Sequence, residues 1–374
     1  MAIDTLTTQI TVNKEILDAL KLAVSVTPKL RFTPILQNIL MTVAHEKLLI
    51  ESTDLALWFQ QTIHVPDLRV EEPFSVLITR DAVKSIKTGA VITLSPLSYR
   101  INLTSYQTVD AKEYPIPPVL FDRSDPEQFA ASTTVNDSYF DDLLACSICA
   151  AESERRPVLG AISHLQNQLR GTDGHRMLIA TQGTEWEHEI LVPAYSAALL
   201  KKAFGRSEQV TMLYDLTHVQ YQDDHHRVNV RQIEGNYPDV RRVVPVRGLL
   251  HATNGVLDHT AAWIDACNAA IQIHDLSNKA ATKENRNHDY TLRIQGDGKN
   301  VDFFAKRDQE FLSVIPFETD RKFKFAVNAK YLKDALQAVG DHSLFFKPNH
   351  ERDALVLEND SRLALVMPVR IDQQ

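Results

Sequence analysis

The chain has 374 residues, of which 44% are hydrophobic and 24% are charged, and its formal net charge is -8. This length exceeds one ordinary core, so two or three domains are expected, and the composition is that of a soluble globular protein. The short apolar runs argue against a membrane span, and the N-terminus lacks the pattern of a secretory signal, so we expect a cytoplasmic protein.

Helix-like and strand-like stretches alternate along the chain. Residues suited to cap a helix N-terminus open helix patterns at Asn13, Thr79, Asn136 and Asn328. The apolar spacing predicts about six helices of roughly 10 to 16 residues. Alternating stretches predict strands at KLLIES (47–52), QVTMLY (209–214), TLRIQ (291–295) and ALVLEN (354–359). Gly-Asp-Gly at 296–298 predicts a hairpin turn.

The sequence contains an internal repeat. VNKEILDAL at Val12 corresponds to VNDSYFDDLL at Val135, 123 residues later, and the same offset relates Pro34-Ile35-Leu36 to Pro157-Val158-Leu159 and Tyr114-Pro115 to Tyr237-Pro238. A third, more divergent copy begins near Leu257. A repeat of this length indicates duplicated domains, and turn formers cluster at the two breaks. We therefore predict three domains, at 1–122, 123–248 and 249–374.

No catalytic constellation is found in the sequence. It has no phosphate-binding glycine loop, no GxSxG elbow and no HExxH motif, so we expect a non-enzyme without cofactor or metal. The three cysteines argue against a disulfide framework, and Cys146 and Cys149 are more typical of a helix core than of a zinc site. The Asp223–His226 run is better explained as a polar hairpin tip than as a metal site.

The stretch GTDGHRMLIA at 171–180 admits two interpretations. Asp-Gly between strand-like runs is a hairpin signal. The corresponding stretch of the first repeat, STDLALWFQ, places Leu55 where Gly174 stands, and leucine does not readily adopt a positive φ. We therefore favour one continuous strand, kinked by a bulge at Gly174, which is either a local variant or a notch on the surface.

Basic residues recur on four of the six predicted helices. Arg80, Lys84 and Lys87 are spaced to share one helix face, and further basic residues lie at Lys14, Lys21, Lys201, Lys202, Arg206, Lys330 and Lys333. A charged stripe is commonly just a solvated face, but the repeat would bring equivalent helices to one surface. The helix containing Asp137, Asp141 and Asp142 departs from this pattern.

Several motifs resemble the bacterial DNA polymerase III beta subunit, the sliding clamp. They are FTPILQNILM, LLIESTDLA, PVLGAISH, RGTDGHRMLIA, IEGNYPDVRRVVP, FAVNAKYLKDAL and ALVMPVRI, in this order along the chain. The resemblance implies an α+β fold of three repeated clamp domains, each with two helices packed on antiparallel sheets, assembled head-to-tail as a dimeric ring. Such a ring encircles duplex DNA without reading its sequence and tethers DNA polymerase and other replication and repair proteins. The alternative is a nuclease-like enzyme built on repeated domains.

The resemblance also implies three sets of site residues. The pocket for short peptides of DNA polymerase and clamp-loader subunits would comprise Leu159, Thr172, Gly174, His175, Arg176, Met177, Pro238, Arg242, Val243, Leu365, Met367, Pro368, Val369 and Arg370. The DNA-binding residues would be Lys29, Arg31, Arg80, Lys84, Lys87, Lys201, Lys202, Lys330 and Lys333. The dimer interface would pair a strand with Ile101, Leu103 and Tyr106 with a segment containing Ile273 and Leu276.

Overall fold

The structure is a computed structural model whose chain falls into two compact units. Unit 1 comprises Met1–Asp141 and Tyr195–Ile233, and unit 2 comprises Asp142–Ala194 and Glu234–Gln374. The structure describes residues 7–28, 33–115, 131–151, 156–244, 255–258, 260–280, 290–306, 310–318, 322–341, 343–346 and 353–369. No helix in these ranges is long and apolar enough to cross a membrane.

Unit 1 contains an eight-stranded sheet, ordered β5-β2-β3-β4-β14-β13-β12-β9, and a four-stranded sheet, ordered β1-β6-β7-β8. The strands are β1 (Thr8–Thr11), β2 (Asn38–Ala44), β3 (Lys47–Thr53), β4 (Leu57–His64), β5 (Phe74–Thr79), β6 (Val91–Ser95), β7 (Ser98–Ile101), β8 (Thr104–Gln107), β9 (Ala131–Val135), β12 (Val210–Tyr214), β13 (His218–Gln222) and β14 (His226–Arg231). The helices are α1 (Lys14–Val26), α2 (Arg80–Lys84) and α4 (Ala197–Phe204), with 3-10 turns η1 (Pro34–Gln37) and η2 (Ala111–Glu113).

Unit 2 contains a six-stranded sheet, ordered β10-β11-β22-β21-β20-β15, and a four-stranded sheet, ordered β18-β17-β16-β19. The strands are β10 (Ala161–Thr172), β11 (Arg176–Pro193), β15 (Gly255–Leu257), β16 (Thr291–Gly296), β17 (Asn300–Lys306), β18 (Glu310–Pro316), β19 (Phe323–Asn328), β20 (Ser343–Phe346), β21 (Leu355–Glu358) and β22 (Arg362–Val366). Helices α5 (Ala261–Ala280) and α6 (Ala329–Val339) belong to this unit, as do the turns η4 (Pro157–Gly160) and η6 (Val240–Arg242). Helix α3 (Asp137–Ile148) contributes to both units, and η5 (Ala194–Ser196) follows β11.

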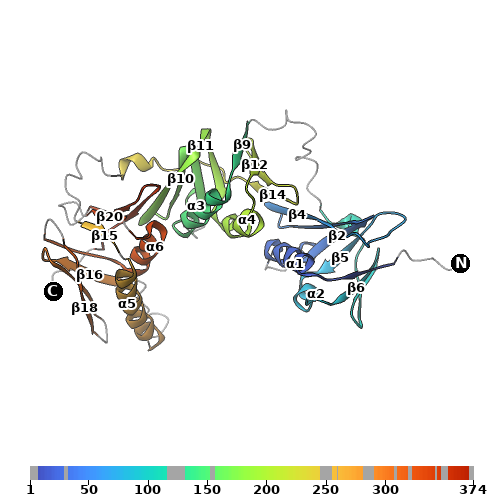
Figure 1. The fold of residues 1–374 in the computed structure, drawn as a ribbon, viewed down its shortest axis with the longest axis horizontal. Coiled ribbons are helices and arrows are strands. Elements are labelled where there is room, and N and C mark those ends of the chain that lie inside the picture. The colour runs from blue at the N-terminus through green and yellow to red at the C-terminus, as the bar shows by residue number, and fades with distance from the viewer. Residues whose placement is uncertain are drawn as a thin grey trace. The chain divides into compact units, whose positions relative to one another are not determined.

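Helices cover one face of each large sheet, because their apolar sides are buried against it. In unit 1, α1 contacts β3 and β4 while α4 contacts β14, and the two helices touch each other (Figure 1). In unit 2, α6 contacts β11, β21 and β22, and α5 packs against α6 and the smaller sheet (Figure 1). Side chains at helical spacing, such as Ile16, Leu20 and Ala23 of α1, are fully buried, as the sequence pattern requires.

Both large sheets join residues that the sequence places in different predicted domains. Strand β4 pairs with β14 in an antiparallel register, and β11 pairs with β22 in the same way. At each of these two pairings the strand edges are covered, so they are not open to pairing with another chain. The three-domain division itself remains a prediction.

Helix starts follow the sequence more closely than helix lengths do. Asn13, Thr79, Asn136 and Asn328 each accept a hydrogen bond from a backbone N–H in the first turn, which confirms the predicted caps. The expected range of lengths is wrong for α2, which has 5 residues, for α4, which has 8, and for α5, which has 20. Because α2 ends at Lys84, Lys87 lies beyond it, and the predicted three-residue stripe is not one helix face.

The kinked-strand interpretation of residues 171–180 is wrong, since they form a hairpin. Thr172 at the end of β10 pairs with Met177 of β11, and Thr53 pairs with Trp58 in the corresponding hairpin of the first repeat. Leu55 adopts φ 77° in spite of its side chain, and Gly174 adopts φ 89°. The strained leucine is held by its neighbours, because its N–H donates to Thr53 Oγ1 and the next two N–H groups donate to Asp54 Oδ1.

The other local predictions are confirmed. Strands occur at all four predicted stretches, and Gly298, with φ 108°, lies in the turn between β16 and β17. The Asp223–His226 run forms the turn between β13 and β14, where Asp223 Oδ1 accepts hydrogen bonds from the N–H groups of His225 and His226. Cys146, Cys149 and Cys267 are buried free thiols.

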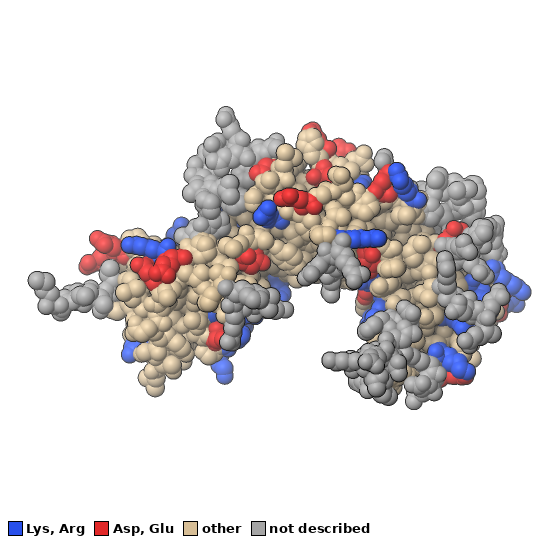
Figure 2. All heavy atoms as spheres, turned by 180° about the vertical axis from the view of Figure 1, so that it is seen from behind, with Lys and Arg blue, Asp and Glu red and all other residues tan. Residues whose placement is uncertain are grey.

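On the face drawn in Figure 2, charged side chains of both signs are interspersed. The described Lys and Arg residues lie among Asp and Glu residues there, and neither sign forms one continuous patch. The described residues of this face therefore form no single-sign patch that would mark a DNA-binding surface.

Glu51 of β3 is a buried carboxyl group in the eight-stranded sheet. It pairs across the strands with Gln60 of β4, which in turn pairs with Arg227 of β14, and the Gln60 amide lies 3.5 Å from the Glu51 carboxyl. The residue is only 5% exposed, and this burial raises its pKa from 4.5 to about 7, against the opposing effect of the Arg227 charge.

We expect the Glu51→Gln variant to be more stable than the parent at pH 8. Between pH 4.5 and about 7 the unfolded chain loses a proton that the folded chain retains, so the parent loses stability as the pH rises. The variant should gain about 1 to 3 kcal/mol at pH 8 and nothing below pH 4.5. Urea unfolding at several pH values measures this difference. Glu187→Gln, at an exposed strand position, should show no such pH-dependent gain.

Candidate functional site

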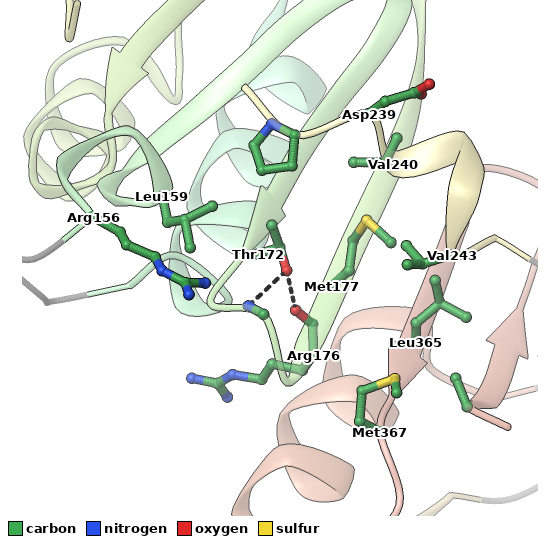
Figure 3. Close-up of a pocket in the computed structure, with 13 residues that line it drawn as sticks. Arg156, Leu159, Thr172, Arg176, Met177, Asp239, Val240, Val243, Leu365 and Met367 are labelled. Carbon is green, nitrogen blue, oxygen red and sulfur yellow. Dashed lines mark hydrogen bonds between the residues drawn. The ribbon is translucent and has the colours of Figure 1, made fainter. Parts of the chain in front are cut away.

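A pocket of about 220 Å³ opens in unit 2 beside the β10–β11 hairpin (Figure 3). The segment at η4, the residues after Tyr237, the residue before β21, and β22 with the residues after it provide its other sides. The lining residues are Arg156, Leu159, Thr172, Gly174, Arg176, Met177, Pro238, Asp239, Val240, Val243, Ala354, Leu365 and Met367.

The pocket has a buried apolar floor and an exposed apolar rim. Leu159, Met177 and Leu365 are 3 to 4% exposed, and they come from η4, β11 and β22. Val243 is 55% exposed and Met367 is 40% exposed at the rim. An apolar floor reached past exposed apolar side chains suits an apolar ligand group, because both surfaces leave water when the group enters.

The hairpin tip is held by its own side chains and by the C-terminal strand. Thr172 Oγ1 donates to the Arg176 carbonyl (2.6 Å) and accepts from the Gly174 N–H (3.1 Å), as Figure 3 shows. The Met367 N–H donates to the His175 carbonyl (2.8 Å). This last bond connects the rim residue Met367 directly to the tip of the hairpin.

Tyr237 anchors the segment that forms the upper side of the pocket in Figure 3. Its hydroxyl donates to the Arg170 carbonyl (3.2 Å), and burial raises its pKa well above the ordinary value. Tyr114, its counterpart in the repeat, donates to the Asn38 carbonyl (3.2 Å), and burial raises its pKa to about 12. The repeated Tyr-Pro pair therefore has a structural cause, since its tyrosine fastens the end of each of the first two repeats to a sheet.

The Arg176 guanidinium is occupied by other protein groups. Nε lies 3.0 Å from Asp173 Oδ2, Nη2 donates to the Ile148 carbonyl (2.6 Å), and Nη1 forms an ion pair with Asp334. The guanidinium also lies over the Tyr331 ring, 4.5 Å from its centroid. In Figure 3 the side chain points away from Met177 and Leu365.

Nine of the fourteen residues predicted for the pocket line it. They are Leu159, Thr172, Gly174, Arg176, Met177, Pro238, Val243, Leu365 and Met367. His175 instead stacks on Tyr331, with ring centroids 6.4 Å apart, and Arg242 is 85% exposed and 3.8 Å from Asp239. Pro368 and Val369 instead contact β19 through their backbone, and Arg370 lies outside the described residues.

Four further lining residues were not predicted. Arg156 immediately precedes the PVLG turn, and Asp239 and Val240 belong to the NYPDVRRV motif. Each therefore lies next to predicted pocket residues in the sequence, and this proximity could have indicated that it also lines the pocket. Ala354 precedes β21 and reaches the pocket only because β21 pairs with β22. The sequence offers no local sign of that contact.

The predicted DNA-binding cations differ in how far they are engaged within the chain. Lys84 is paired with Asp81 (2.7 Å), Lys201 with Asp141 (2.6 Å), and Arg80 donates to the Pro28 carbonyl (3.2 Å). Lys330 lies over the Tyr290 ring, 3.5 Å from its centroid. Lys87 and Lys202 are exposed, Lys333 is half-buried, and Lys29 and Arg31 lie outside the described residues.

The predicted interface residues also differ in exposure. Ile101 is 5% exposed within its own sheet, whereas Leu103, in the turn after β7, is 95% exposed. Tyr106 of β8 stacks on Tyr99, with ring centroids 4.8 Å apart. The segment with Ile273 and Leu276 is helical, within α5, and Leu276 is 47% exposed.

Within the described residues, no group of three His, Cys, Asp or Glu residues could hold a metal ion. Burial raises the pKa of the Cys149 thiol to about 12, so this thiol is protonated at neutral pH and is a poor nucleophile.

Comparisons with known proteins agree with this picture. The family model "DNA polymerase III beta subunit, N-terminal domain" matches residues 8–116. No curated protein sequence matches the chain. Among solved structures, the DnaN sliding clamp of Pseudomonas aeruginosa bound to griselimycin is 18% identical, with a TM-score of 0.78 over 98% of this chain and 100% of that one.

Two further solved structures show the same fold. The Bartonella birtlesii DnaN sliding clamp with griselimycin is 18% identical, with a TM-score of 0.77 over 98% of this chain and 100% of that one. The Bacillus subtilis DNA polymerase sliding clamp is 15% identical, with a TM-score of 0.79 over 99% and 100%. The family model thus covers the first repeat of the chain, and the fold along nearly its full length is similar to that of DNA polymerase sliding clamps.

Proposed function

We propose that this chain is a sliding clamp, which encircles duplex DNA and tethers DNA polymerase and other replication and repair proteins for processive synthesis. Sliding clamps are processivity factors and not enzymes. The observation that carries the proposal is the clamp fold over 98% of the chain together with the family match at residues 8–116. A tether of this kind acts by raising the effective concentration of polymerase at the primer end.

The pocket beside the β10–β11 hairpin is the proposed docking site for partners. Its apolar floor and rim, with a few polar groups around them, suit a short extended peptide that inserts leucine and aromatic side chains. We propose that partner proteins, among them DNA polymerase and clamp-loader subunits, bind here through peptides that carry Gln followed by Leu and Phe. The nine predicted residues that meet at this pocket support the assignment.

A topological experiment tests the clamp function most directly. The protein is loaded with its cognate loader onto closed circular duplex DNA, and the DNA is then linearised with a restriction enzyme. We expect the protein to remain on the circle and to leave the linear form, because a ring can slide off an end. Release from both forms at the same rate would contradict encirclement.

The proposed assembly is a head-to-tail homodimer. The exposed Leu103 beside the edge strand β8 and the exposed Leu276 on α5 support an apolar joint between these two regions. Light scattering should give twice the chain mass of 42.2 kDa at micromolar concentration. Leu276→Asp should shift the protein towards monomer, because it places a charge in an apolar joint. Leu216→Asp, at an 87% exposed turn position, is the matched control and should leave the mass unchanged.

No observation favours the nuclease-like alternative. A nuclease requires clustered carboxylates or histidines beside a basic groove. The one such run noted in the sequence, at Asp223–His226, forms a hairpin turn in which Asp223 is engaged with backbone N–H groups and with the Ser207 hydroxyl (2.6 Å).

A further inference from the structure

Two arginines of unit 2 occupy equivalent places in two hairpins. Arg176 follows the turn that begins at Asp173, and Arg362 follows the turn that begins at Asn359. In both turns the first side chain accepts a hydrogen bond from the arginine N–H, at 3.0 Å for Arg176 and 2.7 Å for Arg362. The two arginines therefore start the adjacent strands β11 and β22, which pair with each other.

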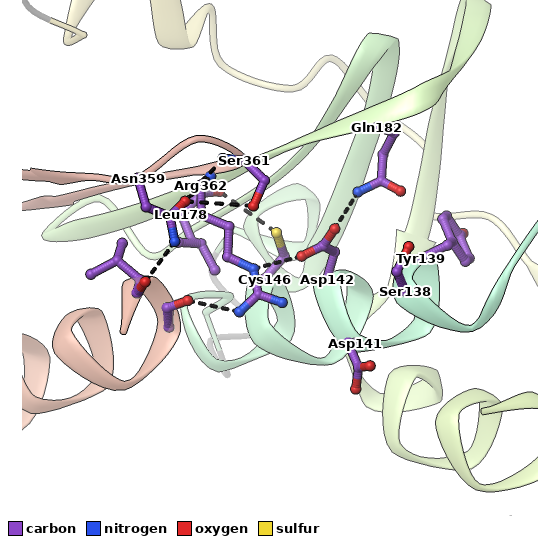
Figure 4. Close-up of polar contacts among 12 residues, drawn as sticks. Ser138, Tyr139, Asp141, Asp142, Cys146, Leu178, Gln182, Asn359, Ser361 and Arg362 are labelled. Carbon is purple, nitrogen blue, oxygen red and sulfur yellow. Dashed lines mark hydrogen bonds and ion pairs between the residues drawn. The ribbon is translucent and has the colours of Figure 1, made fainter. Parts of the chain in front are cut away.

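Each guanidinium contacts two helices in a reciprocal manner. Arg176 donates to the carbonyl of Ile148 at the end of α3 and forms an ion pair with Asp334 of α6. Arg362 donates to the carbonyl of Ala338 near the end of α6 (2.7 Å) and forms an ion pair with Asp142 of α3 (2.6 Å), as Figure 4 shows. Each arginine thus joins the C-terminal turn of one helix to a carboxylate of the other.

Both ion pairs are shielded from water. The side chains of Arg176 and Asp334 are 14% and 27% exposed, and those of Arg362 and Asp142 are 22% and 10% exposed. Asp142 also accepts a hydrogen bond from the Gln182 amide (2.5 Å), which satisfies its second oxygen (Figure 4). Shielded, charge-assisted hydrogen bonds of this kind hold geometry more firmly than exposed pairs do.

The corresponding junction of unit 1 lacks these pairs. Leu57 stands three residues after Asp54, where Arg176 stands after Asp173, and His226 stands three residues after Asp223, where Arg362 stands after Asn359. Leu57 is 4% exposed and packs as an apolar residue. The reciprocal arginines are therefore specific to the junction that contains the pocket and are not a general requirement for joining two such sheets.

The Arg176 contacts also determine where the two sides of the pocket lie. Arg176 stands between the floor residue Met177 and His175. The backbone carbonyl of His175 accepts a hydrogen bond from the N–H of the rim residue Met367. The ion pair with Asp334 secures this tip to α6, which contacts β22 and so the strand that leads to Met367. Arg176 has donors engaged with Asp173, Asp334 and Ile148, so its guanidinium holds protein elements together.

We propose that Arg176 is a positioning residue of the peptide pocket, and that the Arg176–Asp334 and Arg362–Asp142 pairs together hold β11 and β22 at the spacing that forms it. This inference rests on the proposed function of the pocket. In a chain without the Arg176 pair, the hairpin tip would move relative to α6, and the distance between Met177 and Met367 would no longer be fixed.

The test compares Arg176→Met with Arg206→Met in the full-length protein. Both changes remove an arginine, but Arg206 is exposed and is not among the residues that line the pocket. The probe is a blocked, fluorescently labelled peptide carrying Gln, Leu and Phe and no charged residue. Arg176→Met should weaken its binding about tenfold or more, and Arg206→Met less than about twofold. Asp334→Asn, a milder change that does not touch the pocket, should weaken binding about threefold or more.

Hydrogen exchange provides the readout that separates positioning from direct contact. Without peptide, Arg176→Met and Asp334→Asn should speed exchange of the Met367 N–H, whose acceptor is the His175 carbonyl at the tip. Weaker binding in Arg176→Met with unchanged exchange, and with normal binding in Asp334→Asn, would show that Arg176 contacts the peptide directly and would overturn the proposal. If the parent protein fails to bind the peptide, the proposed function fails, whereas the exchange result still decides whether the pair holds the tip.

Discussion

Replacing Met367 with alanine should weaken binding of a Gln-Leu-Phe peptide at least about tenfold, which corresponds to about 1.4 kcal/mol. Met367 is 40% exposed at the rim of the pocket, opposite a floor formed by Leu159 and Met177. An aromatic side chain that enters the pocket would be covered by this methionine, whose flexible chain can adapt to it. Leu159→Asp should weaken binding further, about a hundredfold, because it places a carboxylate on the apolar floor.

Fluorescence anisotropy with a labelled peptide measures both affinities. Leu216→Ala, at an 87% exposed turn position in unit 1, is the control and should bind the peptide normally. Thermal unfolding should show that Met367→Ala is as stable as the parent, since the lost side chain is exposed. Normal peptide binding by both pocket variants would mean that the peptide binds to another surface. The β10–β11 hairpin would then have a structural role only.

Reversing three exposed lysines on α1 and α4 should weaken DNA binding about tenfold or more at low salt. Lys14 and Lys21 on α1 and Lys202 on α4 are exposed and have no ion-pair partner among the described residues. Lys84 and Lys201, by contrast, are already paired with aspartates. The charge of a lysine without an ion-pair partner in the protein is available to attract a phosphate. The variant with glutamate at positions 14, 21 and 202 should therefore lose more DNA affinity than a control variant with three other exposed lysines reversed.

The salt dependence of DNA binding identifies the nature of the contacts. Each lost phosphate contact should reduce the slope of log K against log salt by about 0.9. Lys47→Glu, Lys112→Glu and Lys299→Glu together are the matched control, since these lysines are exposed and lie outside the α-helices. Anisotropy on a short labelled duplex, which a ring can thread from its ends, measures both variants. Equal losses would mean that net charge, and not the helix surface, governs the attraction.

Much of the architecture was predictable because the repeat leaves local signs in the sequence. The N-caps at Asn13 and Asn328, the turn at Gly298 and the strands around it follow from residues that act on their immediate neighbours. The Tyr-Pro pairs at Tyr114 and Tyr237 were visible as a repeat, and their hydroxyl groups explain why the pair recurs.

The remaining features depend on contacts that no local pattern encodes. The positive φ of Leu55 is imposed by Thr53 and Asp54, so the propensity of leucine was a poor guide to the hairpin. Arg176 lines the pocket as expected, but the engagement of its guanidinium by Asp334, 158 positions along the chain, has no local sign in the sequence. Ala354 reaches the pocket only through the pairing of β21 with β22.

The pairing of β4 with β14 bears on the biosynthesis of this protein. The ribosome makes β4 long before β14, whose Val228 pairs with Phe59. It likewise makes β11 long before β22, whose Leu363 pairs with Ile179. In the interval the nascent chain carries two strands with open edges, and such edges invite pairing with other chains. Production of this protein should therefore depend on chaperones that cover those edges until the distant strands emerge.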